Sequence, residues 1–361
     1  MKERIVFIVN HDVVIYNFRK ELVEKLLEMN YEIFIFSPSG SKIDKLIELG
    51  CVHIDISINR HGTNIIEEMK LVHKYYQELK KIKPKVVLTY TIKPNIYGGI
   101  ASKLLKIPYI SNVTGLGNAI ENDNFMQKLF SFMYSTSLKG ASFVFFQNED
   151  NLNFFRKKLN HKKIDLLPGS GVNLSQFKPL SYPNTKNINF LFLARIMKEK
   201  GIDEFLSVAK RIKEESNDVY FHIAGFIDGD YENIIENEVQ LGNVIYHGMV
   251  DDVANVFKDI HCLVLPSYHE GMSNVVLEAC ASARPVIASN IPGCKEIVDH
   301  NKTGFLCEAK SAESLYEAVE KFIGLNLTEK ICMGNKARKK VENNFNRQII
   351  IDKYIERIEG I

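Results

Sequence analysis

Short apolar runs alternate with amphipathic stretches along almost the whole chain, and this alternation restricts the possible folds more than any other feature. The apolar runs lack the alternating polar positions of a half-exposed strand, so they predict strands that are buried on both faces. Between them, apolar residues recur three and four positions apart, which predicts helices. An alternation of buried strands and helices favours parallel sheets that are covered by helices on both faces.

The chain contains two successive series of such elements. In the first we expect strands over Ile5–Val9, Ile33–Phe36, Val52–Ile56, Val86–Thr89, Tyr109–Val113 and Phe143–Gln147, with helices over Tyr16–Asn30, Ile43–Leu49 and Ile65–Lys81. In the second, after Leu167–Gly171, we expect strands over Phe190–Ala194, Val219–Ala224, Val244–His247, Leu263–Pro266, Val286–Ala288 and Gly304–Leu306, with helices over Ile202–Lys213, Asn274–Ala281 and Ala312–Ile323.

The predicted fold class is therefore α/β, with two doubly wound, Rossmann-like domains. A length of 361 residues suits two domains. We expect them to cover residues 1–170 and 171–345, and we expect a final helix within 346–361 to pack back across the hinge. Ligands of such sheets bind beyond the carboxyl ends of the strands. The default site is then the cleft between the two domains.

Charge is balanced over the chain but uneven between its halves. The 46 Lys and Arg against 44 Asp and Glu leave a net charge of +2, which gives no reason to expect a nucleic-acid partner. Residues 1–170 contain 24 basic and 17 acidic residues, and residues 171–361 contain 22 and 27. This asymmetry fits either an anionic surface or substrate beside the first half, or simply Lys-rich solvated helices.

Neither the cysteines nor the apolar runs indicate a metal site, a disulfide framework or a membrane span. The six cysteines include no C-x-x-C pair, so we expect no metal and a reducing compartment. The apolar run near the N-terminus is too short for a signal peptide, and no stretch reaches 18 apolar residues. We expect a cytoplasmic protein with at most peripheral membrane contact. The segment Phe125–Leu138, rich in Phe and Met, reads either as core or as an interfacial helix.

The segment Pro266–Glu278 carries the densest set of reactive side chains. A strand ends at Pro266, a polar loop follows, and a helix begins near Asn274. Uncapped N–H groups at a helix start favour an anion. Glu270 would repel that anion, so we expect its carboxylate to bind something else, such as sugar hydroxyls. The alternative is an ordinary loop–helix junction with a solvated glutamate.

A second strand-to-loop segment, Phe190–Gly201, carries two cations. Arg195 and Lys200 stand five positions apart, and together they could neutralise a leaving diphosphate. Two weaker signals remain. Asp228-Gly-Asp230 reads as a polar turn rather than a metal motif, and His11-Asp12 reads either as an acceptor contact or as a strand-end turn.

These segments resemble glycosyltransferase family 4, whose members have the GT-B fold of two Rossmann-like domains facing across a cleft. The matching pieces are Arg195 with Lys200-Gly201 and the E-x7-E pattern from Glu270 to Glu278. Supporting pieces are Gly248–Asp252, Ala283–Ala288, and Pro292-Gly293 with Glu296. In the first half, Thr91–Gly98 and Val113–Gly117 look like those of enzymes that extend polyprenyl-diphosphate-linked sugars in bacterial surface glycans, often with N-acetylhexosamine.

The resemblance implies a role for each matching residue. Arg195 and Lys200 would hold the donor diphosphate, Glu270 the donor sugar, and Glu278 the nucleotide ribose. The remaining donor contacts would come from the helix start and the base pocket: Gly271, Met272, Ser273, Asn274, Val275, Met249 and Val250. Family members are retaining and metal-independent, so we expect neither a metal nor another cofactor.

Acceptor contacts are expected in the first half, at Asn17, Arg19, Lys93, Asn95, Thr114 and Gly115. The chain departs from the family twice here. The usual Gly-rich loop after the first strand is replaced by Asn10–Tyr16, without glycine, and the usual histidine is replaced by Thr114. A front-face reaction, in which the leaving phosphate takes the acceptor proton, needs no such histidine.

The expected function is therefore a retaining glycosyltransferase that moves a sugar, N-acetylhexosamine by preference, from a UDP-sugar to a polyprenyl-diphosphate-linked saccharide. The partners would be a nucleotide sugar, the lipid-linked acceptor and an anionic membrane surface. Two alternatives remain: a UDP-sugar epimerase of the same fold, and a non-catalytic subunit that binds sugar nucleotides.

Overall fold

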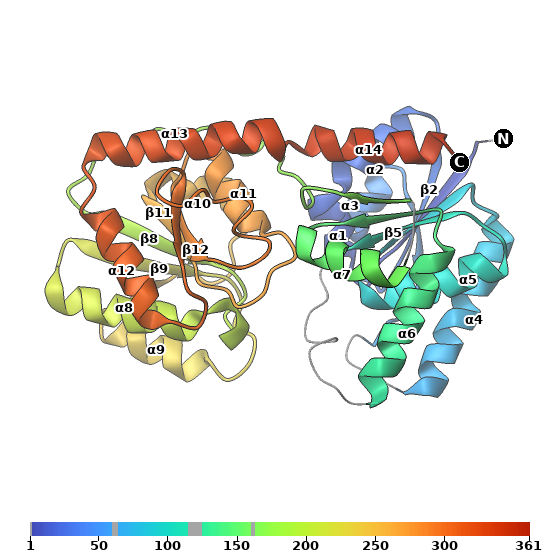
Figure 1. The fold of residues 1–361 in the computed structure, drawn as a ribbon, viewed down its shortest axis with the longest axis horizontal. Coiled ribbons are helices and arrows are strands. Elements are labelled where there is room, and N and C mark those ends of the chain that lie inside the picture. Colours follow the sequence, from blue (N-terminus) through green and yellow to red (C-terminus); the bar gives the residue numbers. More distant parts are fainter. Residues whose placement is uncertain (1, 60–63, 115–124, 160–162) are drawn as a thin grey trace. The chain divides into compact units, whose positions relative to one another are not determined.

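The structure is a computed structural model that describes residues 2–59, 64–114, 125–159 and 163–361 (Figure 1). The chain forms two compact units, Met1–Ser170 with Gln348–Ile361, and Gly171–Arg347. Each unit contains a parallel sheet with helices on both faces. The predicted α/β class, with two doubly wound sheets, is confirmed.

The first unit is built on a parallel sheet in which, over the described residues, seven strands pair in the order β3-β2-β1-β4-β5-β6-β7. The strands are β1 (Arg4–Ile8), β2 (Glu32–Ser37), β3 (Val52–Asp55), β4 (Val86–Tyr90), β5 (Tyr109–Val113), β6 (Phe143–Phe146) and β7 (Ile164–Leu166). Strand β1 shows why these strands appear in the sequence as unbroken apolar runs. Ile5 and Phe7 pack into the core on one face, whereas Val6 and Ile8 pack into the core on the other.

Helices cover both faces of this sheet. On one face lie α1 (Asp12–Phe18), α2 (Lys20–Glu28), α3 (Ile43–Glu48) and the C-terminal α14 (Arg347–Glu359). On the other lie α4 (Ile65–Ile82), a π-helical turn (Pro94–Gly98), α5 (Gly99–Leu104), α6 (Phe125–Gly140) and α7 (Glu149–Leu159). Helix α14 is anchored by Ile350, Ile351, Tyr354 and Ile358, which are buried in the core of the first unit.

The helix predicted over Tyr16–Asn30 is wrong in one respect, because the structure contains two helices there. Arg19 separates α1 from α2 and has a φ of −136°, outside the helical range. Its side chain is buried, with the guanidinium over the rings of Tyr90 and Tyr354. An apolar stripe cannot reveal this break, because the partners of Arg19 lie far away in the sequence.

The second unit repeats the architecture with a parallel sheet in the order β10-β9-β8-β11-β12-β13 over its described residues. The strands are β8 (Ile188–Leu193), β9 (Val219–Ala224), β10 (Ile245–Tyr246), β11 (Cys262–Leu265), β12 (Val286–Ser289) and β13 (Gly304–Cys307). The helices are α8 (Ile202–Glu215), α9 (Glu232–Gln240), α10 (Val253–Val256), α11 (Asn274–Ala281), α12 (Ala312–Ile323) and α13 (Leu327–Asn344), with 3-10 turns at Lys198–Lys200 and Phe257–Asp259.

Each sheet has a point at which the strand order reverses direction. In the first unit this point lies between β1 and β4, and in the second between β8 and β11. Neighbouring loops leave the sheet in opposite directions there, which opens a crevice beyond the carboxyl ends of the strands. In the second unit, Arg195 and Lys200 follow β8 and Glu270 follows β11, so the strand order brings the two predicted donor segments to one crevice.

Candidate functional site

The central contact of the site is an ion pair between Lys200 and Glu270. Lys200 Nζ lies 2.6 Å from Glu270 Oε1, and the two side chains are only 19% and 13% exposed. The hydroxyl of Ser267 donates to the same carboxylate oxygen at 3.0 Å. These two donors orient the carboxylate, so two residues that are 70 positions apart in the sequence form one charged centre.

Glycines allow the two loops to approach this closely. Gly201 ends the 3-10 turn after Lys200 with a φ of +77°, and a Cβ there would lie 2.1 Å from the carbonyl oxygen of Pro266. Gly293 has a φ of +88°, and a Cβ there would lie 2.9 Å from the carbonyl oxygen of Glu270. A side chain at either position would push the Glu270 loop away, which explains the need for glycine.

The start of α11 has N–H groups without a side-chain cap, which is an arrangement that favours an anion. Its N-cap residue, Ser273, makes no side-chain capping bond, and its own N–H donates to Gly293 at 2.9 Å. The first N–H groups of α11 therefore have no side-chain cap from within the helix. Met272 and Ser273 are buried, and Gly271, Asn274 and Val275 are half-buried. The Oδ1 of Asn274 is buried without a hydrogen-bond partner among the described residues.

Glu278 lies one helical turn further along α11 and is half-buried. Burial raises its pKa from 4.5 to about 7, and the charge of Arg347 opposes that rise. A carboxyl group with such a pKa exchanges its proton near neutral pH, so its hydrogen-bonding ability changes within the working range of an enzyme.

Arg195 has a different partner from the one that its predicted role suggests. Its guanidinium bonds Asp228 Oδ2 at 3.1 Å, and half of the side chain is exposed. Gly229 follows with a φ of +103°, so Asp228-Gly-Asp230 forms a turn. In the part of the chain that the structure describes, no group of three His, Cys, Asp or Glu side chains could hold a metal ion.

The predicted base-pocket loop lies beside the end of β9. Met249 is 72% exposed, and Val250 is half-buried against the core. The carbonyl of Gly248 accepts from the N–H of Gly225 at 2.8 Å, which ties this loop to β9. Next to it, His222 stacks on His247, and burial lowers the pKa of His222 to about 4.

The predicted acceptor residues of the first unit have unequal exposure. Asn17 is exposed on α1, but Arg19 is only 3% exposed and packs in the core. Asn95 is also fully buried, where its amide donates to the carbonyl of Asn112 and to the hydroxyl of Tyr134. Both side chains hold the interior of this unit together, and neither is exposed to a ligand in this structure, so the acceptor role predicted for Arg19 and Asn95 gains no support from their positions.

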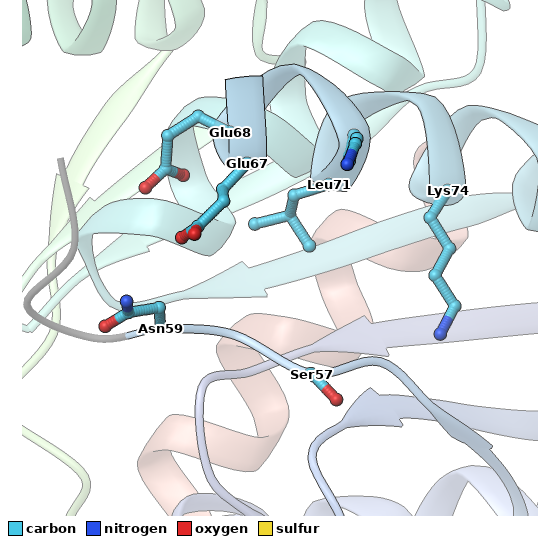
Figure 2. A pocket seen from close by; sticks show the side chains of 7 residues that line it. Ser57, Asn59, Glu67, Glu68, Leu71 and Lys74 are labelled. Carbon is cyan, nitrogen blue, oxygen red and sulfur yellow. The ribbon is translucent and has the colours of Figure 1, made fainter. Parts of the chain in front are cut away.

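Lys93 contacts two residues that line a cavity of about 300 Å³ beside the N-terminal half of α4 (Figure 2). It pairs with Glu68 and donates to the carbonyl of Asn59 at 2.6 Å. The cavity is lined by Ser57, Asn59, Glu67, Glu68, Lys70, Leu71 and Lys74. Thr114 is half-buried just after β5, and Gly115 lies outside the described residues.

Sequence reasoning missed two supports of the donor loop. Ser267 holds the Glu270 carboxylate, and the buried hydroxyl of Tyr268 donates to Glu204 Oε1 on α8 at 2.8 Å. A Ser-Tyr pair after a strand is common, so no local signal distinguishes it. Only the place of Glu204 in the fold shows that this loop is anchored on α8.

Two family models match the chain. Residues 176–344 match "Glycosyl transferases group 1", and residues 4–148 match "Glycosyl transferase 4-like". Among curated proteins, the chain is 28% identical to an N,N'-diacetylbacillosaminyl-diphospho-undecaprenol alpha-1,3-N-acetylgalactosaminyltransferase of Campylobacter jejuni, over 99% of each chain. It is also 28% identical to a UDP-Gal:alpha-D-GlcNAc-diphosphoundecaprenol alpha-1,3-galactosyltransferase of Escherichia coli, over 80% of this chain and 79% of the other.

Solved structures share the fold. The crystal structure of Anabaena HepE in complex with UDP-glucose superposes with a TM-score of 0.81 at 14% identity, covering 99% of this chain and 100% of the other. Two doubly wound parallel sheets, shared with solved glycosyltransferase structures, place the chain in the GT-B class of fold. Because the two family models together span most of both units, the chain belongs to the glycosyltransferases, with a 4-like first domain and a group 1 second domain.

Proposed function

We propose that this glycosyltransferase transfers an N-acetylhexosamine from a UDP-sugar to a polyprenyl-diphosphate-linked saccharide, with retention of anomeric configuration and without a metal ion. The observation that carries the proposal is the Lys200–Glu270 pair at the switch point of the second sheet. The relatives from C. jejuni and E. coli, named for undecaprenyl-diphosphate-linked substrates, support the choice of acceptor.

In this proposal the second unit binds the donor. Lys200, Arg195 and the uncapped N–H groups at the start of α11 supply positive charge for the leaving diphosphate. When the donor is bound, the Lys200 ammonium can bridge a phosphate oxygen and Glu270, since it has three N–H donors. The carboxylate of Glu270 then accepts hydrogen bonds from sugar hydroxyls, and Glu278 accepts them from the ribose.

The role proposed for Glu278 predicts a pH dependence of donor binding. Because its pKa is raised to about 7, Glu278 is mostly protonated at pH 6 and mostly ionised at pH 8. Only the carboxylate accepts hydrogen bonds from two ribose hydroxyls. We expect UDP-sugar affinity, measured by calorimetry, to rise up to about tenfold between these pH values. Glu278→Gln should weaken binding and remove the pH dependence. If the affinity of this variant changed with pH as steeply as that of the wild type, Glu278 would not be the source of the pH dependence.

The reaction itself is tested by a donor panel. The protein is incubated with UDP- and GDP-sugars, with and without a polyprenyl-diphosphate-linked N-acetylhexosamine. We expect acceptor-dependent UDP release from a UDP-N-acetylhexosamine, an extended product whose new linkage retains the donor configuration by NMR, and unchanged rates in EDTA. An epimerised sugar formed without acceptor would favour the epimerase, and loss of activity in EDTA would contradict the metal-free mechanism.

A lipid-linked acceptor requires contact with a membrane surface, and we propose that the first unit makes it peripherally at the cytoplasmic face. No helix within the described ranges is long and apolar enough to cross a bilayer. Helix α4 begins with Ile65, Ile66 and Met69, which are 62%, 65% and 68% exposed. On α6, Phe132 is exposed, whereas Tyr134 and Leu138 are buried. Both helices follow parallel strands, so they begin at the carboxyl edge of the sheet (Figure 1).

This proposal predicts a specific loss of membrane binding. Ile66→Glu should reduce the fraction of protein that floats with anionic liposomes at low salt, because the apolar side chain that enters the interface becomes charged. Leu104→Glu is the matched control, since Leu104 is 65% exposed but lies at the C-terminal end of its helix, α5. Equal flotation of wild type and Ile66→Glu would remove α4 from the membrane contact.

A further inference from the structure

The loop after β12 supports both the Glu270 loop and the start of α11. Strand β12 pairs in parallel with β11, so the segment that follows Ser289 leaves the sheet beside the segment that carries Glu270. The carbonyl oxygen of Gly293 accepts from the N–H of Ser273 at 2.9 Å. The backbone of Gly293 also packs against the Glu270 carbonyl, since a Cβ there would lie 2.9 Å from that oxygen. The place of the Glu270 loop therefore depends on the place of Gly293.

A carboxylate fixes the backbone of Gly293. Glu296 Oε2 accepts from the N–H of Gly293 at 2.7 Å, a short hydrogen bond to a charged acceptor. Gly293 has a φ of +88°, and glycine restricts its own backbone less than any other residue. The conformation of this turn therefore depends on its contacts. Glu296 holds the N–H on one side of the Gly293 Cα, and Ser273 holds the carbonyl on the other.

The residue after Gly293 indicates how close these groups are to the charged centre. Cys294 is fully buried, and burial raises the pKa of its thiol. The charge of Glu270 adds to this rise, that of Lys200 opposes it, and that of Glu296 adds to it again. Because such effects weaken with distance, all three charges lie near one buried sulfur atom. Glu296 therefore supports the charged centre from within the same part of the unit.

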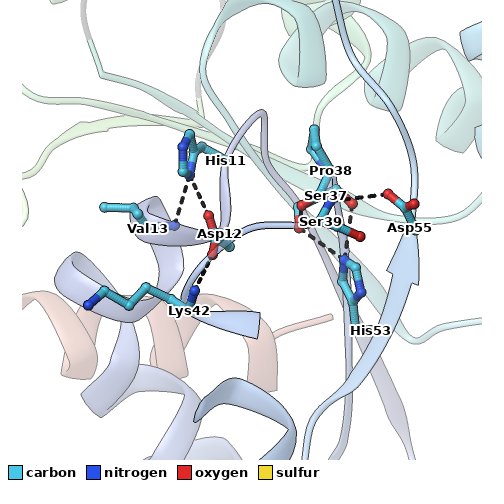
Figure 3. Close-up of polar contacts among 9 residues, drawn as sticks. All are labelled: His11, Asp12, Val13, Ser37, Pro38, Ser39, Lys42, His53 and Asp55. Carbon is cyan, nitrogen blue, oxygen red and sulfur yellow. Dashed lines mark hydrogen bonds and ion pairs between the residues drawn. The ribbon is translucent and has the colours of Figure 1, made fainter. Parts of the chain in front are cut away.

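The switch point of the first unit needs no such support. The N–H of Val13 donates to His11 Nδ1 at 3.3 Å, and the N–H of Lys42 donates to Asp12 Oδ2 at 2.6 Å (Figure 3). Asp12 is fully buried behind the partly exposed His11. These bonds fit the strand-end turn, one of the two alternatives that the sequence leaves open. The start of α11 has no side-chain cap of its own, so another segment must hold it in place.

We propose that Glu296 is a positioning residue of the donor site. By holding the Gly293 turn, it keeps the N–H groups at the start of α11 aligned with the Lys200–Glu270 pair, so that both act on one diphosphate. This inference rests on the proposed function and deepens it. Glu296 itself does not bind the diphosphate, because a carboxylate repels it. In the sequence, Glu296 only supported the family resemblance.

Three variants separate the reach of Glu296 from its charge. Glu296→Gln keeps an acceptor oxygen and loses the charge, Glu296→Asp keeps the charge and shortens the side chain by one methylene, and Glu296→Ala removes both. We expect UDP affinity to stay within about threefold of wild type in Glu296→Gln and to fall about tenfold in the other two, as for one lost hydrogen bond to a charged group. Asp299→Ala is the matched control, since this nearby carboxylate is 51% exposed and pairs with Lys340.

Calorimetry with UDP and with uridine distinguishes positioning from a general loosening of the unit. Uridine lacks the diphosphate, so its affinity should change less than about twofold in every variant. Thermal unfolding checks that each variant is folded. If Glu296→Ala does not fold, the comparison of Glu296→Gln with Glu296→Asp still decides the question.

Each contrary result has a definite meaning. UDP affinity within about twofold of wild type in both Glu296→Asp and Glu296→Ala would overturn the positioning role. An equal loss of uridine affinity would overturn it as well, and so would a Glu296→Gln variant as weak as Glu296→Ala. All of these measurements are made without an acceptor. If wild type binds UDP but transfers no sugar to any lipid-linked acceptor, the proposed function fails, while the role of Glu296 is still decided by UDP binding.

Discussion

Glu270→Gln is expected to lower kcat for sugar transfer by at least about 100-fold, the usual cost of removing one oriented charged group from an active site. One oxygen of the carboxylate accepts hydrogen bonds from both Lys200 Nζ and the Ser267 hydroxyl. An amide keeps the shape of the side chain but loses the charge that holds the ammonium in place. Lys200→Ala should produce a loss of the same order. The double variant should be far less impaired than the product of the two losses, because the residues act as one unit.

Lys198→Ala provides the matched control for this prediction. Lys198 lies in the same 3-10 turn as Lys200, but its side chain is exposed. Transfer by this variant should remain close to wild type. Rates are measured with saturating donor and acceptor, and thermal unfolding checks that each variant is folded. A Glu270→Gln enzyme within tenfold of wild type would contradict the catalytic role of the pair.

Arg284→Met is expected to destabilise the protein by roughly 3 kcal/mol, because several buried carbonyl groups would lose their donors. Arg284 is fully buried, and its guanidinium donates to the carbonyls of Phe257 and Ser181 at 2.8 Å. Three longer bonds go to the carbonyls of Leu180 and Lys258, at 3.2 Å each, and of Ser282, at 3.5 Å. Burial lowers the pKa of Arg284 to about 10, so the charge itself carries a cost. Removing that cost offsets only part of the loss, since methionine can donate to none of the five carbonyls.

Urea unfolding of the Arg284→Met variant measures this effect. The control is Arg211→Met, which removes an exposed arginine of the same unit that pairs with Glu313 at 2.8 Å. Its midpoint should barely move, because exposed ion pairs contribute little to stability. If both variants unfold at the wild-type midpoint, the buried hydrogen bonds of Arg284 are not what holds this part of the unit together.

Arg284 also shows where a family resemblance and a structural role diverge. In the sequence, Ala283–Ala288 only supported the resemblance, without a stated role. The structure shows that Arg284 joins the segment at 180–181 to the turn at Phe257–Asp259. A motif that identifies a family therefore need not touch substrate, since a buried cation with five carbonyl partners is hard to replace.

The fold was predictable from the sequence because the apolar patterns that determine it lie within short segments of the chain. Strands such as Val86–Tyr90 are buried on both faces, so every residue is apolar, a tyrosine or a hydrogen-bonded threonine, and the run can be recognised without knowing its partner strands. The break at Arg19 and the short strand Ile164–Leu166 were missed. Their cause lies in distant residues, namely the rings of Tyr90 and Tyr354 for Arg19, and pairing with β6 for the strand.

The donor side of the candidate site was more predictable than the acceptor side. Lys200 and Glu270 stood out because charged and small residues gathered where apolar strands ended, and the structure brings them within 2.6 Å. Asn95 and Lys93 also followed a strand end, yet Asn95 is buried among Asn112 and Tyr134, and Lys93 pairs with Glu68. Position at a strand end predicts the edge of the sheet, but not whether a side chain turns outward or inward.

By itself, the sequence determined the class of fold, the loops that carry the chemistry and the resemblance to glycosyltransferases, because apolar periodicity and short motifs depend on neighbours along the chain. Only the tertiary structure decided which of those residues meet. It joined Lys200 to Glu270, assigned Arg195 to Asp228, buried Arg19, and set Asp12 behind His11. Each of these depends on strand order and on close approaches at glycines, and neither can be read from residue spacing.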